Sequence, residues 1–439
     1  MTALTQSQPA VAASPWRRHG LLLLLTLLYA DTFIGRQIMA VMIEPIKLEF
    51  GVSDSAMGLV SGLAFAAVFA VIGLSAGQLA DRVTRTKLLA GCTILWGITT
   101  LLCGFATGFF TLIIARMLVA VAESPVSASS LSIISDLYPI HRRAFAISCF
   151  VSAPTFAAII AMSLGAWLVE QYGWRTAFML VALPSVLIAL FFLFVSEPRR
   201  GTYDPPIPTS NVSLKLGETL KELLQHKTFM LLILSSAIAT MGANAYGMWN
   251  ATFLVRSHGL ELQDAGILAG FVGGGSAALG LLFSGWFTDH LVRINPRWQI
   301  IIPLVGHGLG IVTMIAYLLW PTDILFNLDG LAVPVAMLWC ALNGFFKVWW
   351  VGPCFSLITQ LVPADRRAIA LACQTVLVTV LGVGVGPFAI GLFSDMLQPS
   401  VGTESLRYAL LFSCFTMATA AILFLKAAPD LQRRAQAGN

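Results

Sequence analysis

Charged side chains are scarce in this 439-residue sequence: they make up 11% of it, whereas hydrophobic residues make up 57%. A soluble domain carries roughly 25% charged residues, because polar groups must cover its water-exposed surface. A chain of this length cannot cover itself with so few charges, and the mean hydropathy of +0.83 agrees. The composition excludes an ordinary soluble protein and indicates a surface covered by lipid.

The sequence also lacks the patterns of metal and redox chemistry. Its seven cysteines lie in apolar stretches and form no CxxC pair, which is typical of small buried hydrophobic residues. No HExxH motif and no His/Asp cluster at ligand spacing is present. We therefore expect no catalytic residue, no metal and no other cofactor, and we do not expect an enzyme.

Apolar runs long enough to cross a bilayer recur along the chain. A hydrocarbon core of about 30 Å needs about 20 apolar residues of helix. Windows of that length centre near residues 31, 66, 97, 124, 155, 185, 241, 276, 310, 346, 382 and 416. The pattern predicts an all-α membrane protein with twelve transmembrane helices in two pseudo-symmetric bundles of six.

Positive charges are distributed unevenly between the two sides of this arrangement. If the N-terminus is cytoplasmic, 19 of the 26 Lys and Arg residues fall in cytoplasmic segments and four in outer ones. The positive-inside rule then predicts a multi-pass protein of the (inner) cell membrane with cytoplasmic N- and C-termini. The net charge of +5 follows from this topology, and we expect no nucleic-acid partner.

Polar segments divide the chain into five parts. Leucines at helical spacing near the end of the central polar connection predict a short amphipathic helix on the membrane surface. The expected parts are a disordered tail at 1–17, a six-helix bundle at 18–197, a cytoplasmic linker with the amphipathic helix at 198–226, a six-helix bundle at 227–428 and a C-terminal tail at 429–439.

Two blocks of sequence recur, in order, in the two halves. Four positions in the second apolar run recur 208 residues later in the eighth: Gly58, Gly62, Gly77 and Asp81 become Gly266, Gly270, Gly285 and Asp289. A second block, residues 135–144, recurs at an offset of 224 as residues 359–368. We therefore predict two parallel repeats, with the extra 16 residues between spans 8 and 10.

The turn after the second apolar run carries a motif, Gly-Gln-Leu-Ala-Asp-Arg at 77–82, followed by Arg85. It resembles the signature between spans 2 and 3 of the major facilitator superfamily, and the resemblance covers about residues 18–428. More narrowly, the chain resembles the spinster branch, whose members include lysolipid and sphingolipid phosphate transporters. The stretches that carry this resemblance are Tyr29 to Arg36, Glu44 to Lys47, Ala122 to Pro125, Gly173 to Arg175, Gly352 to Arg367 and Gly382 to Pro387.

Span 1 departs from the pattern of that branch, which usually shows an Asp-Arg pair. Here Gly35 stands at the aspartate position and Arg36 is kept. Asp31 lies four residues earlier, about one helical turn away and on roughly the same face. Either the carboxylate has been relocated to Asp31, or the coupling role that the resemblance implies has been lost there.

Five charged residues lie inside predicted spans, where charge is costly and marks a functional candidate. Glu123 and Lys347 are separated by the repeat offset of 224, so they are equivalent positions of opposite charge. The alternative is a static network of ion pairs that fixes helix packing. The five are Asp31, Arg36, Arg116, Glu123 and Lys347.

These charges and the polar residues near them suggest three roles. Burial and neighbouring arginines make carboxylates suitable for proton coupling. The expected proton-coupling residues are Glu123 and Asp31. The expected substrate-binding residues are Arg36, Arg116, Lys347, Asn343, Trp350, Asn244 and Trp249. The expected gating residues are Asp81, Arg82, Arg85 and Asp289.

The resemblance and the intramembrane charges together predict a monomeric transporter that works by alternating access. We expect a proton-coupled or facilitative carrier for an amphipathic anionic solute of the lysolipid or sphingoid-phosphate type, with protons and membrane lipids as further partners. The alternatives are a carrier of organic anions or other small metabolites in the same superfamily, and a substrate sensor without flux.

Overall fold

The computed structural model describes residues 15–200, 202–203, 216–328, 330–362 and 367–437, and these are almost entirely helical. The N-terminal half contains α1 (Pro15–Gln37), α2 (Met39–Phe50), α3 (Asp54–Gly58), η1 (Leu59–Leu63), α4 (Ala64–Arg82), α5 (Arg85–Gly104), α6 (Phe109–Glu123), α7 (Val126–Leu137) and α8 (Ile140–Phe194). The polar linker contributes α9 (Leu216–Gln225).

The C-terminal half has the same succession of membrane crossings with one addition, a β-hairpin. Its elements are α10 (Lys227–His258), α11 (Leu262–Ile267), η2 (Leu268–Gly274), α12 (Gly275–Ile294), α13 (Trp298–Leu319), β1 (Ile324–Leu328), β2 (Leu331–Pro334), α14 (Ala336–Lys347), α15 (Val351–Leu361), α16 (Arg367–Leu377), η4 (Val378–Val385), α17 (Gly386–Val401), η5 (Gly402–Glu404), α18 (Ser405–Leu410) and α19 (Phe412–Ala437). The last helix continues through Pro429 into the predicted tail.

Nine helical stretches of the described chain are long and apolar enough to cross a membrane. Two of them hold two crossings each: α8 reverses at Gly173, whose φ is +78°, and the stretch from Ile369 to Leu431 reverses at Gly402, whose φ is +60°. The remaining crossing consists of α14 and α15, which are 12 and 11 residues long with a break between them. The chain is therefore an integral membrane protein with the twelve predicted crossings.

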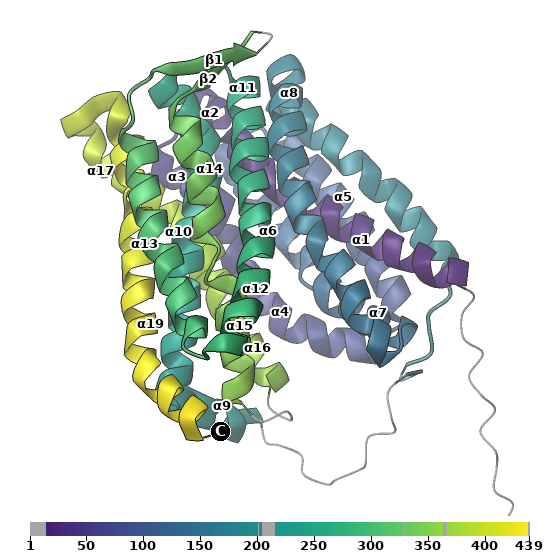
Figure 1. The fold of residues 1–439 in the computed structure, drawn as a ribbon. Coiled ribbons are helices and arrows are strands. Elements are labelled where there is room, and N and C mark those ends of the chain that lie inside the picture. The colour runs from purple at the N-terminus through teal and green to yellow at the C-terminus, as the bar shows by residue number, and fades with distance from the viewer. Residues whose placement is uncertain (1–14, 201, 204–215, 329, 363–366, 438–439) are drawn as a thin grey trace, which may run out of the picture.

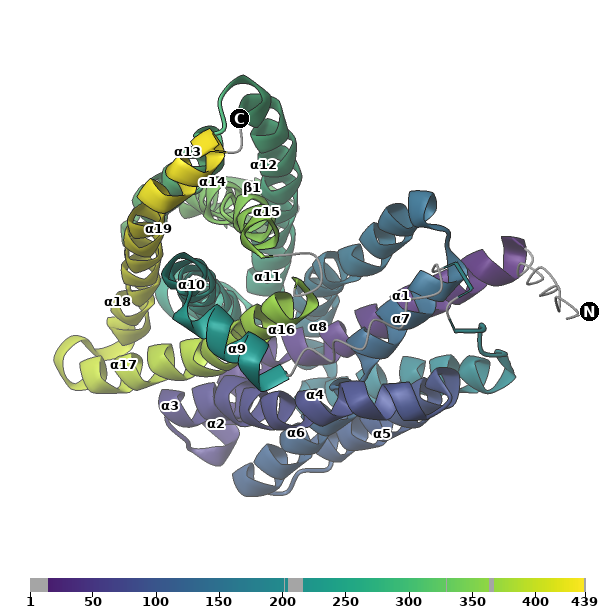
Figure 2. The ribbon, with the colours of Figure 1, turned by 90° about the horizontal axis from the view of Figure 1, so that it is seen from below.

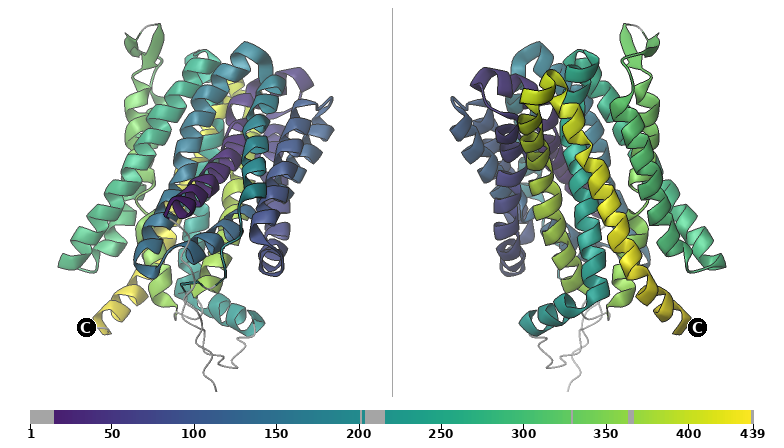
Figure 3. Two further views of the ribbon diagram at one scale, coloured as in Figure 1. Left: turned by 90° about the vertical axis from the view of Figure 1, so that its right-hand side faces the viewer. Right: turned by 90° about the vertical axis from the view of Figure 1, so that its left-hand side faces the viewer.

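The two halves form separate bundles that lie side by side (Figure 2). They meet where α3 packs against α17 and where α8 packs against α11. Figures 1 and 3 show the β-hairpin at one end of the molecule and α9 lying across the other. We call these the hairpin end and the α9 end.

The β-hairpin accounts for the change in repeat offset. Its antiparallel strands pair Leu328 with Leu331 and Ile324 with Pro334. The hairpin lies between α13 and α14, which form spans 9 and 10, and so inserts residues where the sequence predicted 16 extra ones. It is a local departure from the expected all-α fold, and it does not change the number of crossings.

Buried apolar residues are arranged differently at the two ends. One cluster joins both halves at the hairpin end, since it contains Met39 and Ile43 of α2 together with Phe253 of α10. Two further clusters belong to single halves, one around Leu25 and the other around Phe424. The halves thus share a core at the hairpin end and have cores of their own toward the α9 end.

The repeated glycines make the contact between halves close and symmetric. A Cβ on Gly62 would lie 2.8 Å from the carbonyl oxygen of Val383, and one on Gly270 would lie 3.1 Å from that of Ile159. Gly62 and Gly270 differ by 208, and Ile159 and Val383 by 224, the two offsets of the repeat. Only glycine allows the backbones to approach this closely. Gly62 and its copy Gly270 therefore both serve the interface between halves.

Candidate functional site

An ion pair between Arg36 of α1 and Glu123 of α6 lies within the N-terminal half. The carboxylate is 4% exposed. The guanidinium also lies 4.6 Å from the ring centroid of Phe33 and 4.8 Å from that of Phe65. A third ring, that of Phe69, lies 5.8 Å away. Aromatic faces attract a desolvated cation, so one carboxylate and three rings stabilise the charge of Arg36. The second carboxylate oxygen of Glu123, Oε2, has no hydrogen-bond partner among the described residues.

Glu123 occupies the last position of a helix that breaks inside the membrane. α6 ends there, Ser124 and Pro125 form a turn, and α7 begins at Val126. Proline supplies no backbone donor, so it interrupts the ladder of helical hydrogen bonds. Broken helices of this kind are the usual location of binding and coupling sites in transporters with internal repeats.

Arg116 lies in α6, seven residues before Glu123, and supports the Arg36–Glu123 pair. Its side chain is 1% exposed and donates a hydrogen bond of 3.0 Å from one terminal nitrogen to the carbonyl oxygen of Gly35. The contact ties α6 to α1 one residue away from Arg36. The geometry therefore favours a positioning role for Arg116 over direct contact with a substrate.

The position of the missing aspartate, Gly35, is closed by an aromatic ring. A Cβ on Gly35 would overlap Cζ2 of Trp96, a fully buried residue of α5. Asp31 is also buried, at 4% exposed, and makes no ion pair within the described part of the chain. In the usual pattern an aspartate at position 35 stands beside Arg36. Here Arg36 pairs with Glu123, and Asp31 does not pair with Arg36 in its place.

We expect Gly35→Asp to destabilise the protein, because the new side chain must displace Trp96 from a packed core. Overpacking costs about 1–3 kcal/mol, which lowers the melting temperature of the purified protein by several degrees. When Trp96 is already replaced by alanine, the added change Gly35→Asp should cost less stability than it does in the wild type. Equal losses on both backgrounds would show that the ring does not set the limit.

Lys347 occupies the equivalent position in the other half. It is the last residue of α14, as Glu123 is of α6, and a turn again separates it from the next helix. Its Nζ lies 4.3 Å from the ring centroid of Tyr246, and it forms no ion pair among the described residues. The two halves thus present opposite charges at matching helix breaks, and only the carboxylate has a counter-ion.

The other predicted substrate residues are engaged to different degrees. The indole of Trp249 is fully buried and donates to the carbonyl oxygen of Pro387 at 3.0 Å. The amide of Asn343, also fully buried, donates to Gly310 at 2.9 Å. These contacts favour helix packing. Trp350 stacks on His307 with ring centroids 6.5 Å apart, and Asn244 is half-buried.

Among the predicted gating residues whose side chains the structure describes, Arg85 is the one held in a network. It is 2% exposed and donates to Asp136 at 2.5 Å and to Glu197 at 2.8 Å. Arg82 and Asp289 are exposed, and the side chain of Asp81 lies outside the described part of the structure. The Arg85 contacts all lie within the N-terminal half, so they brace that half in this conformation.

A charge network between the halves at the hairpin end was not singled out from the sequence. Arg256 of α10 donates to both carboxylate oxygens of Asp54, at 2.8 and 2.9 Å, and to Glu44 at 2.8 Å. Lys47 adds a contact of 2.6 Å to Asp54. In the sequence, Lys47 and Arg256 are two of the four basic residues on the outer side, and Lys47 also belongs to a stretch that carries the family resemblance. The signal that sequence reasoning missed is that Ser53-Asp54-Ser55 begins a helix, where acidic residues are favoured.

Two carboxylates extend this network symmetrically. Asp395 of α17 accepts the backbone N–H of Ser55, at 2.8 Å, from the start of α3 in the other half. Glu170 of α8 accepts the backbone N–H of Gln263, at 2.7 Å, from the start of α11. Ser55 and Gln263 differ by the repeat offset of 208. Each half therefore caps the first turn of a helix of the other, where free backbone donors and the helix dipole favour negative charge.

Two six-helix repeats that meet in a symmetric interface, with charged residues at broken helices inside the membrane, are typical of secondary transporters built from internal repeats. A model of the Major Facilitator Superfamily matches residues 22–372. The chain belongs to this superfamily, and the relatives named below are transporters.

Three known proteins illustrate the similarity. A solved bacterial homolog of the human lysosomal transporter Spinster, in an inward-facing and unoccupied conformation, is 26% identical with a TM-score of 0.85, over 96% of this chain and 99% of that one. An MFS-type efflux pump of Mycolicibacterium smegmatis is 30% identical over 90% of this chain and 88% of its own length. The sphingosine-1-phosphate transporter SPNS2 of Danio rerio is 26% identical over 90% and 81%.

One short pattern of enzyme type does occur. Residues 73–77 read Gly-Leu-Ser-Ala-Gly, which matches the GxSxG of hydrolases. That motif works at a sharp turn between a strand and a helix, whereas residues 73–77 lie within the helix α4. The match has no catalytic context here.

Proposed function

We propose that this protein is a proton-coupled carrier of an amphipathic anionic solute, of the lysolipid or sphingoid-phosphate type, with both termini in the cytoplasm. The observation that carries the proposal is the pair of opposite charges, Glu123 and Lys347, at matching helix breaks in the two halves. Coupled transport of an anion requires two groups. One is a carboxylate that can bind a proton, and the other is a cation that has no counter-ion of its own.

The coupling step is an exchange of partners at Arg36. While Glu123 is ionised, it neutralises Arg36 and the site is closed to an anionic head group. When Glu123 binds a proton, Arg36 loses its counter-ion, and an uncompensated buried charge is costly. An anionic substrate then relieves that cost by pairing with Arg36 and with Lys347 of the other half.

The conformation of the molecule supports an alternating-access cycle. The halves are joined at the hairpin end by the shared core, the Arg256 network and the two helix caps. Nineteen of the 26 basic residues fall in the segments that the sequence assigns to the cytoplasm. The linker that contains α9 is one of these segments, so the α9 end is the cytoplasmic end. This state is then the inward-facing one, the conformation named for the similar Spinster homolog.

The substrate class rests on the aromatic and cationic character of the site. Phe33, Phe65 and Tyr246 surround the two cations with apolar faces, which suits a solute with a charged head and a long apolar body. The similar SPNS2 is named as a transporter of sphingosine-1-phosphate. The similarity to an efflux pump favours a second candidate, the export of organic anions or other small molecules.

A flux assay separates the two candidates. We expect the purified protein, reconstituted in liposomes, to move a fluorescent lysophospholipid and to do so faster with an imposed pH gradient. Protein-free liposomes with the same gradient are the control. Movement of small organic anions without lysolipid would support the second candidate, and flux of both kinds that ignores the gradient would exclude proton coupling.

A further inference from the structure

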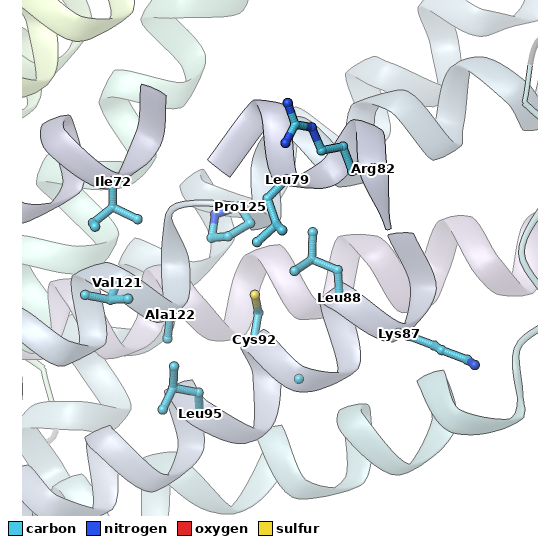
Figure 4. Close-up of a pocket in the computed structure, with 11 residues that line it drawn as sticks. Ile72, Leu79, Arg82, Lys87, Leu88, Cys92, Leu95, Val121, Ala122 and Pro125 are labelled. Carbon is cyan, nitrogen blue, oxygen red and sulfur yellow. The ribbon is translucent and has the colours of Figure 1, made fainter. Parts of the chain in front are cut away.

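A groove in the N-terminal half is lined by residues of that half alone. It lies between α4 and α5, and its floor is the break between α6 and α7 (Figure 4). Its volume is about 610 Å³. Apolar side chains such as Leu79, Leu95 and Val121 line most of it, and two cations, Arg82 and Lys87, lie where α4 turns into α5.

Within the described part of the chain, no segment fills this groove. Leu79 is 46% exposed and Leu95 is 41% exposed. A Cβ added to Gly91, which also lines the groove, would meet no atom within 4 Å. Because the groove lies along two membrane-crossing helices, these apolar surfaces are in contact with lipid.

The two cations at its end have no protein partner within the described part of the chain. Arg82 and Lys87 are exposed and make no hydrogen bond or ion pair. Arg85, which lies between them in sequence, is bound by Asp136 and Glu197. One of the three neighbouring charges therefore braces the fold, and the other two are available to a ligand.

The length of the groove matches one leaflet. From Arg82 to Ile72 along α4 is ten residues, or about 15 Å of helix at 1.5 Å per residue. Half of a hydrocarbon core of about 30 Å is the same length. An acyl chain placed along α4 and α5 therefore reaches from the level of the cations to about the bilayer midplane.

We propose that this groove binds an anionic phospholipid of the leaflet at the α9 end, with its head group at the turn that carries Arg82 and Lys87 and an acyl chain between α4 and α5. Basic residues at the membrane surface attract anionic lipids, and the apolar lining accepts the chain. The acyl chain in this groove contacts Ala122 and Pro125, which lie beside Glu123. The bound lipid therefore supports the helix break of the transport site. The inference concerns lipid binding by the purified protein and does not rest on the proposed substrate or coupling.

Photo-crosslinking tests the proposal. The protein is reconstituted in phosphatidylcholine vesicles that contain either phosphatidylglycerol or phosphatidylcholine with a diazirine in one acyl chain, and labelled peptides are mapped by mass spectrometry. We expect phosphatidylglycerol to label residues 72–95 several-fold more strongly than phosphatidylcholine does. In the variant Arg82→Gln/Lys87→Gln this preference should be lost, so that the two probes label residues 72–95 equally.

Two further variants make the result decisive. Gly91→Leu places a side chain in the groove at a position where an added Cβ meets no atom within 4 Å, so both probes should label residues 72–95 less. Arg293→Gln/Arg297→Gln removes two exposed cations from the turn between α12 and α13, the equivalent turn of the other half, and should leave labelling of 72–95 unchanged. Labelling that is no stronger in 72–95 than on other lipid-facing helices, or equal for both probes, would mean that only annular lipid contacts this face and would overturn the proposal.

Discussion

Replacing Glu123 with glutamine is expected to abolish transport driven by a pH gradient. Glutamine cannot bind and release a proton, and it leaves Arg36 without a counter-ion in a site where the removed carboxylate was 4% exposed. Breaking a buried ion pair in this way costs about 3–5 kcal/mol. In liposomes, gradient-driven flux should fall by at least about ten-fold, toward the level of protein-free vesicles.

Three companion variants separate coupling from folding. Glu123→Asp keeps the carboxylate and should retain part of the gradient dependence, whereas Asp31→Asn should retain most of it, because Asp31 does not pair with Arg36. If Glu123→Gln melts too early to assay, Arg36→Gln/Glu123→Gln removes both charges and should restore stability without restoring coupling. Full gradient dependence in a folded Glu123→Gln protein would place the coupling site elsewhere.

Replacing Arg256 with glutamine is expected to open the hairpin end. The change removes the cation that holds Asp54 and Glu44 across the two halves and leaves Lys47 as the nearest positive charge. The Arg256 side chain is 13% exposed, so the loss is smaller than for a fully buried pair. A bias of about 2 kcal/mol changes the ratio of closed to open molecules by roughly thirty-fold.

Hydrogen exchange measures this opening directly. The amides of Ser55 and Gln263 are bonded to Asp395 and Glu170 of the opposite half. When the halves separate, both amides lose these acceptors, so peptides over residues 53–58 and 261–266 should exchange faster in Arg256→Gln than in the wild type.

The matched control removes an ion pair at the same end that does not join the halves. Arg175 donates to Glu49 at 2.6 Å and to Ala106 at 3.1 Å, all within the N-terminal half. Arg175→Gln should leave exchange of both peptides unchanged. Unchanged exchange in Arg256→Gln would show that the glycine contacts and the shared core hold the hairpin end closed without this charge network.

The sequence by itself determined the architecture, since the features that specify it are local or periodic. Apolar runs of about 20 residues require membrane-crossing helices, and the repeated glycines Gly58 and Gly62 with their copies indicated two related halves. The equivalence of Glu123 and Lys347 was also readable from the offset. The structure adds that both residues end a helix, because the break at Ser124 and Pro125 interrupts a run that hydropathy alone reads as continuous.

Only the tertiary structure decided which groups meet. Nothing in the sequence pairs Arg36 with Glu123, 87 residues away, and no periodicity reveals that Trp96 closes the position at Gly35. The lock at the hairpin end depends on Arg256 reaching Asp54 across the interface between halves. Ion pairs and steric limits of this kind arise when distant helices pack. Hydropathy and spacing report only how each helix meets lipid or its own neighbours along the chain.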